Sequence, residues 1–158
     1  MMTGRRLAMV AGMALLTATT SLAQNGAQMG GQGGAKNSLS EKLMANEHKV
    51  LEAVTHRDAA AFSALVMPGS WSVDNSGIMK SDDFVKAFSD VKVESVKASE
   101  MRVVTIDANA ALVVYKLDQK GSFKGMAWPP VVYASTVWAN HGGTWHAVFH
   151  QESAADKP

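Results

Sequence analysis

Apolar positions near the start of the folded part of the chain recur at helical spacing. Over residues 39–56 they fall three and four positions apart, a pattern that predicts an amphipathic α-helix. Ser38 and Glu41 fit the S-x-x-E capping box that fixes a helix N-terminus. The predicted helix would lay one apolar stripe against the rest of the domain.

Two shorter helices are predicted to follow. Asp58 can cap a helix over residues 59–66, which the Pro-Gly pair at 68–69 would end. Ser81 can cap another helix over residues 82–89, whose first turn carries two acidic residues that suit the helix dipole.

From Val91 onward the apolar pattern changes to one that predicts β-strands. The clearest turn sequence is Asn-His-Gly-Gly at 140–143. Residues 128–130 (Trp-Pro-Pro) are predicted to form a loop or an edge, because proline lacks the N–H that a central strand needs. Helices followed by antiparallel strands define an α+β layout. The predicted strands are residues 71–74, 101–107, 110–118, 131–139 and 144–151.

Both faces of the predicted sheet carry apolar residues. Pairing across the four-residue turn sets Trp138 opposite Trp145 on one face and Tyr133 opposite His150 on the other. An antiparallel sheet with one face in water normally alternates apolar and polar residues. We therefore predict that helices cover one face and that a second copy of the chain covers the other, giving a homodimer. The predicted interface set is Tyr133, Ser135, His146 and His150.

Composition narrows the classes of function. Hydrophobic residues make up 47% and charged residues 18%, which is typical of a globular domain. Fifteen Lys and Arg against fourteen Asp and Glu give a net charge of +1, without the basic surplus of a nucleic-acid-binding protein. Cysteine is absent, which excludes disulfides, thiol catalysis and thiolate metal sites. We expect no nucleic-acid partner and no cofactor.

The N-terminus has the pattern of a secretory leader. Arg5 and Arg6 precede an apolar run, Leu7 to Leu16, and small residues lead to a cleavage site between Ala23 and Gln24. The run is too short for the roughly 20 residues that a membrane-spanning helix needs. The mature protein is therefore predicted to be periplasmic or secreted, without a membrane anchor, with Sec and twin-arginine export both open.

These observations divide the chain into four parts. Residues 1–23 are predicted to be a signal peptide. Residues 24–37 contain five glycines and no aromatic or β-branched residue, so we predict a flexible tether. The folded domain is predicted over 38–153, with a short tail at 154–158.

Three histidines near the C-terminus raise the question of a metal site. Four strand residues span roughly 13 Å, which is too far for His146 and His150 to share a zinc ion held about 2 Å from each ligand nitrogen. His141 falls in the predicted turn. No metal site is predicted.

The order and spacing of four segments resemble the nuclear transport factor 2-like superfamily, which includes ketosteroid isomerase and the SnoaL-like polyketide cyclases. The resemblance is closest to the domain-of-unknown-function 4440 group of bacteria. It implies a cone-shaped α+β fold, in which N-terminal helices pack on a strongly curved, mostly antiparallel sheet. It implies no particular reaction, because the superfamily contains enzymes, binding modules and assembly domains. The segments are 47–62 (EHKVLEAVTHRDAAAF), 71–77 (WSVDNSG), 135–138 (STVW) and 143–153 (GTWHAVFHQES).

The resemblance to ketosteroid isomerase suggests candidate catalytic residues inside the cone. Asp74 would be the general base and Tyr115 the hydrogen-bond donor to a developing oxyanion. Turn chemistry favours another role for Asp74, as the first residue of an Asp-Asn-Ser-Gly turn. His150 is a third candidate.

Glu47 lies at helical phase on the face that should contact the sheet. A buried carboxylate needs partners. Glu47 therefore either points into the cone, paired with Tyr115, Arg102 or Gln151, or lies at the helix margin and reaches water.

The predicted ligand pocket draws on the first helix, the short strand and two hairpins. Trp138 would line its opening, whereas Trp145 would be core, so Trp138→Ala is predicted to cost less stability than Trp145→Ala. The predicted pocket residues are Glu47, Asp74, Tyr115, Trp138 and Gln151.

Three functions are compatible with these residues. The leading prediction is binding of a small, largely apolar ligand in the cone pocket. The second is an enzyme of isomerase, dehydratase or cyclase type that uses a pocket carboxylate or histidine as general base. The third is a homo-oligomeric interaction module with no ligand.

Overall fold

The computed structural model describes residues 31–155, with side chains from residue 38 onward. Three α-helices and a short 3-10 helix precede or interrupt the first strands. The second helix has the predicted start, because the Asp58 side chain accepts a hydrogen bond of 2.9 Å from the backbone N–H of Ala61. The helices are α1 (Gly31–His56), α2 (Ala59–Leu65), α3 (Ser81–Lys86) and η1 (Phe88–Asp90).

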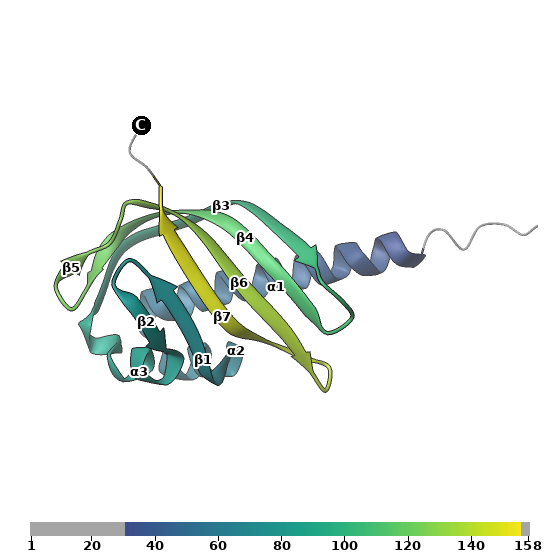
Figure 1. Cartoon of the computed structure of the whole chain (residues 1–158), viewed down its shortest axis with the longest axis horizontal. Coiled ribbons are helices and arrows are strands. Elements are labelled where there is room, and N and C mark those ends of the chain that lie inside the picture. Colours follow the sequence, from purple (N-terminus) through teal and green to yellow (C-terminus); the bar gives the residue numbers. More distant parts are fainter. Residues whose placement is uncertain (1–30, 156–158) are drawn as a thin grey trace, which may run out of the picture.

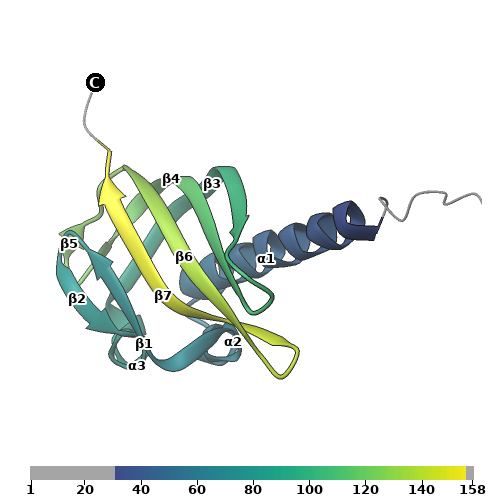
Figure 2. The same cartoon turned by 45° about the vertical axis from the view of Figure 1, so that its right-hand side comes forward.

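Helix α1 is longer at its N-terminus than the sequence pattern predicts. It begins at Gly31 rather than near Ser38, so residues 31–37 of the predicted tether are helical, and Ser38 does not cap the helix. Once a packed helix exists, each further residue adds one backbone hydrogen bond, so a helix can extend beyond its packed part. These turns project past the sheet (Figures 1 and 2). The predicted leader and residues 24–30 lie outside the described residues.

The seven strands form one strongly curled sheet with the order β2-β1-β7-β6-β4-β3, and β5 pairs with β4. The β1–β7 pair is parallel and the other pairs are antiparallel. Helix α1 packs on β3 and β4 and lies against the concave side of the sheet (Figure 1). The predicted α+β cone is therefore confirmed. The strands are β1 (Val66–Asp74), β2 (Gly77–Lys80), β3 (Val91–Thr105), β4 (Ala110–Phe123), β5 (Met126–Ala127), β6 (Val131–His141) and β7 (Thr144–Ala154).

The turn between β6 and β7 is shorter than predicted. His141 pairs with Thr144, so only Gly142 and Gly143 form the turn. Both have positive φ, 60° and 90°, as a two-residue hairpin turn of the primed type requires. The predicted pairing of Trp138 with Trp145 is therefore wrong, and Trp138 pairs with Ala147.

A β-bulge then changes which residues of β7 face the inside. Val137 pairs with Phe149 whereas Trp138 pairs with Ala147, so Val148 has no partner on β6. Side chains alternate along a strand, so one extra residue shifts this alternation. Each residue of β7 after Val148 therefore lies on the face opposite to the one that unbroken alternation predicts. His150 pairs with Thr136 on the concave face, not with Tyr133 on the outer face as predicted.

Helix α3 starts differently from the prediction. Ser81 is the first residue of the helix rather than its cap, and its buried hydroxyl contacts the backbone oxygen of Met67 at 3.3 Å. The Pro-Gly pair at 68–69 lies within β1, where pairing with β7 is interrupted between Val66 and Trp71. A proline without an N–H is tolerated at such an irregularity.

Aromatic rings close one end of the core. Phe84 of α3 lies edge to face with Phe62, Phe88 and Phe123, at centroid distances of 5.8, 5.1 and 5.7 Å. Such arrangements stabilise a packed core beyond the area that they bury. These contacts tie α2 and α3 to the far end of β4.

Candidate functional site

A cavity of about 340 Å³ lies between the concave face of the sheet and the helices. Its wall is mainly apolar, with polar groups gathered on one side. Exposed residues of the β1–β2 hairpin and of β5, including Asp74 and Met126, also belong to the lining and form its mouth. Apolar wall residues include Leu51, Val54, Phe62, Val96, Leu117 and Val132.

Glu47 of α1 is the centre of the polar side. Its side chain is 1% exposed, and its carboxyl group accepts three hydrogen bonds from the sheet. Tyr115 Oη and Thr136 Oγ1 donate to Oε1 at 2.9 and 2.8 Å. Trp138 Nε1 donates to Oε2 at 2.8 Å. Three donors provide the partners that a buried carboxyl group needs, so Glu47 does not lie at the helix margin.

Tyr115 acts in this cluster as a donor. Burial raises the pKa of its hydroxyl well above the ordinary value of 10.0, and the charge of Glu47 and the bond to it act in the same direction. The hydroxyl therefore keeps its proton at neutral pH. Its bond to Glu47 occupies the group that would otherwise serve as an oxyanion donor.

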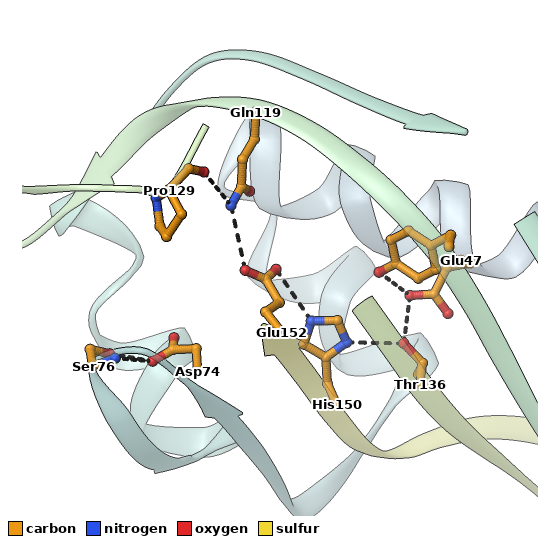
Figure 3. A network of polar contacts seen from close by, with 9 residues as sticks. Glu47, Asp74, Ser76, Gln119, Pro129, Thr136, His150 and Glu152 are labelled. Atoms are coloured by element: carbon orange, nitrogen blue, oxygen red, sulfur yellow. Dashed lines mark hydrogen bonds and ion pairs between the residues drawn. The ribbon is translucent and has the colours of Figure 1, made fainter. Parts of the chain in front are cut away.

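His150 continues the polar chain toward the cavity (Figure 3). Its Nδ1 lies 3.0 Å from Thr136 Oγ1, and its Nε2 lies 3.4 Å from Glu152 Oε1. Because the Thr136 hydroxyl donates its single hydrogen to Glu47, it accepts from Nδ1 of His150. A proton on Nε2 would then give an imidazolium that donates to Glu152.

The surroundings of His150 favour that charged form. Burial alone lowers the pKa of the imidazole, but the hydrogen bond and charge of Glu152, with the charges of Glu47 and Asp74, outweigh it. The net pKa is raised above 6.5. The pair therefore stabilises the folded state fully below the ordinary pKa, and this contribution is lost as the pH rises through the raised one.

Glu152 also contacts the wall formed by the loop after β5. Its Oε2 lies 3.4 Å from Gln119 Nε2, which in turn donates to the backbone oxygen of Pro129 at 3.3 Å. The neighbouring Trp128 packs over Gly121, where a Cβ would come within 2.6 Å of the indole ring. Only glycine allows this close approach. Residues 128–130 form a loop, as predicted.

The structure brings together only part of the predicted pocket. Glu47, Asp74 and Tyr115 line the cavity. Trp138 does not: it is 0% exposed and belongs to the core. Gln151 is exposed and pairs with Ser135 on the outer face, so the prediction that it shares a face with Trp138 is wrong.

The side chain of Asp74 is hydrogen-bonded within its own turn. Its Oδ1 accepts from the backbone N–H of Ser76 at 2.7 Å and from the Ser76 hydroxyl at 2.5 Å. This confirms the turn role that the sequence favours. Figure 3 places this pair apart from the polar chain around His150.

The polar residues of the cavity that the sequence reasoning misses include Gln119, Thr136 and Glu152, which make up the polar chain beside His150. Gln119 lies just beyond the predicted end of its strand. Thr136 gives a signal in the sequence, since it is the polar member of an otherwise apolar alternation from Val132 to Trp138. Nothing in the sequence pattern marks Glu152, because only the bulge at Val148 turns it inward.

Over residues 31–155, no three His, Asp or Glu side chains gather as metal ligands do. Within the same residues, none of the helices combines the length and hydrophobicity needed to cross a bilayer.

Helices packed on the concave side of a curled sheet, around a cavity, define a known class of α+β cone. No protein-family model matches the chain, and no curated protein matches its sequence. Solved structures do match it. An NTF2-like protein from Cytophaga hutchinsonii is 18% identical, with a TM-score of 0.67 over 73% of this chain and 97% of that one.

Two other matches span similar shares of the chain. An NTF2-like protein of unknown function in nutrient uptake from Rhodospirillum rubrum is 17% identical, with a TM-score of 0.65 and coverage of 72% and 98%. The association domain of C. elegans CaMKII is 17% identical, with a TM-score of 0.61 and coverage of 75% and 98%. The chain therefore has the nuclear transport factor 2-like fold. The narrower likeness to the domain-of-unknown-function 4440 group stays a prediction.

Proposed function

We propose that this protein binds a small, largely apolar molecule in the cavity of the cone. The observation that carries the proposal is the cavity itself, about 340 Å³ with a mainly apolar wall and one polar side. Ligand sites in proteins are usually concave and apolar, range over roughly 300–1,000 Å³ and hold a few polar groups that orient the ligand. His150 and Glu152 are polar groups placed to do this.

The pair of His150 and Glu152 favours an enzyme as the second candidate function. An imidazole beside a carboxylate, both facing a cavity, can accept or deliver a proton during isomerisation, dehydration or cyclisation. Of the three predicted catalytic residues, His150 is the one in this position. Tyr115 and Asp74 are each bonded to a neighbour.

Native mass spectrometry of the protein purified from its own host tests both candidates. We expect a small molecule to remain bound to the wild-type protein. Ser72 lies on the concave face of β1 beside His150, so Ser72→Phe should fill the cavity and remove the bound mass. Ser95→Phe, at an exposed position of β3, is the matched control and should retain it.

The masses of the bound molecules also distinguish ligand binding alone from catalysis. One retained molecule indicates binding alone, and a mixture of that molecule with an isomer or a dehydrated form indicates turnover. Absence of any bound mass in both the wild type and Ser95→Phe would contradict the binding proposal. We also propose that the protein is exported, so the intact mass from the same sample should start at Gln24.

We further propose that the protein forms a homodimer through the outer face of the sheet. An apolar row crosses four strands in register on this face, from Val104 through Leu112 and Val137 to Phe149. Val104 is 52% exposed, and Tyr133 of the predicted interface is 59% exposed. His150 leaves the predicted interface, because the bulge turns it inward.

Light scattering at micromolar concentration checks the dimer. The wild type should have twice the mass of one chain. Val137→Lys should yield monomer, because a second copy would bury the added charge without a partner. Ile78→Lys, on the edge strand β2 where the side chain is 72% exposed, should remain dimeric. A monomeric wild type would contradict the proposal.

A further inference from the structure

The charged groups around the cavity are mostly acidic. Glu47, Asp74 and Glu152 line it, and His150 is the one basic side chain among the described lining residues. Even with His150 protonated, three carboxylates against one imidazolium leave the lining negative. Lys80 contacts the ring of Trp71 at the mouth, but no Lys or Arg belongs to the described lining.

Glu152 is the carboxylate with room for a further partner. Glu47 already accepts three bonds and is 1% exposed. Asp74 is held by its turn. Glu152 makes one long contact of 3.4 Å with each oxygen, to His150 and to Gln119, and its side chain is 23% exposed. A carboxylate offers about four acceptor directions, so at least two face no protein donor.

An aromatic residue belongs to the same cavity lining as Glu152. The Gln119 amide that contacts Glu152 also contacts Pro129, and Trp128 precedes it in the chain and lines the cavity. A cation is attracted both by a carboxylate and by the face of an indole ring. An anion would find neither a guanidinium nor an ammonium group among the described lining residues.

We propose that the cavity selects molecules that join an apolar body to a protonated amine, and that Glu152 binds the amine. This rests on the proposed ligand-binding function and specifies its ligand class. The apolar body occupies the part of the cavity near Leu51, Val54 and Val96 of the wall. The ammonium group donates to the Glu152 oxygens that no protein group uses.

The test compares three probes that share one apolar body, namely phenylbutylamine, phenylbutanol and phenylbutyrate. Isothermal titration of the purified protein at neutral pH and low ionic strength measures each Kd. A hydrogen bond to a charged group is worth enough to tighten binding about tenfold or more. We therefore expect the amine to bind at least about tenfold more tightly than the alcohol, and the carboxylate to bind most weakly.

Glu152→Gln should remove the preference while leaving the cavity in place. The Kd of the amine should rise to within about twofold of that of the alcohol, and the unchanged affinity for the alcohol reports an intact cavity. Glu94→Gln is the matched control. This acid pairs with Lys120 at the surface, its side chain is 61% exposed, and its loss should leave all three affinities unchanged.

Each of the other possible outcomes contradicts a stated part of the proposal. If phenylbutanol or phenylbutyrate binds the wild type as tightly as the amine, the amine proposal fails while ligand binding stands. If none of the three probes binds, the proposed function fails and the amine proposal with it. If Glu152→Gln keeps the preference, Glu152 is not the amine's partner. The comparison of probes on the wild type needs no variant, so it tests the proposal even if Glu152→Gln does not fold.

Discussion

Trp138→Ala is expected to lower the free energy of unfolding by about 5 kcal/mol, since two costs combine. The first is loss of a fully buried aromatic side chain, which costs about 3–5 kcal/mol. The second is loss of the indole N–H that bonds Glu47 Oε2 at 2.8 Å. A buried acceptor without its donor costs about 1–3 kcal/mol.

Trp145→Ala is the comparison, measured by urea unfolding in the same buffer. Trp145 is 7% exposed and contributes packing without the Glu47 bond, so its loss should stay near 3–4 kcal/mol. This order is the reverse of the one that the sequence predicts. Trp138→Phe keeps most of the packing, so its loss in the free energy of unfolding should report mainly the hydrogen bond from the indole to Glu47. A smaller loss for Trp138→Ala than for Trp145→Ala would contradict the buried cluster.

Glu47→Gln should cost about 3 kcal/mol, although it changes neither the length nor the shape of the side chain. The amide oxygen can replace Oε1 and accept from Tyr115 and Thr136. The amide nitrogen then faces Trp138 Nε1, so two donors oppose each other in the core. Urea unfolding measures the change.

Two further variants test whether the effect of Glu47→Gln arises from its bond to Trp138. Glu41→Gln, on an exposed position of the same helix, should change stability by no more than about 0.5 kcal/mol. Combining Glu47→Gln with Trp138→Phe removes one of the opposed donors, so the double variant should lose less than the sum of the single losses. Additive losses would show that Trp138 and Glu47 do not interact.

The sequence is sufficient to predict the α+β layout and most of its elements. Helical spacing over 39–56, the cap at Asp58 and the glycine-rich turn before Thr144 are local signals, and each element forms where they indicate. Strand ends are less well predicted: β3 is continuous from Val91, where the strand pattern begins, whereas the predicted hairpin strand starts only at Met101. The bulges that let this strand follow the curvature of the sheet leave no simple alternation in the sequence.

The site is harder to predict than the fold, because it depends on register. Helical phase makes Tyr115 one of three possible partners of a buried Glu47, and the structure shows that this bond forms. The sequence predicts the correct face of the sheet for Trp138, but whether a residue on that face reaches the cavity or the core depends on α1 above it. The sequence pattern predicts His150 on the outer face and Gln151 on the concave face. The structure shows the reverse, because no sequence signal locates the unpaired Val148.

That single unpaired residue makes the chemistry of the cavity depend on strand register as well as on residue identity. If Val148 instead paired with Val137, alternation would continue unbroken along β7, and every later pair would shift by one residue. Phe149 and Gln151 would then face the cavity, and His150 and Glu152 would move to the outer surface. An imidazole beside a carboxylate would be replaced by a phenyl ring and a neutral amide, with no residue substituted. The presence or absence of this one bulge can therefore exchange an acidic binding site for an uncharged one, which a comparison of residue types alone would overlook.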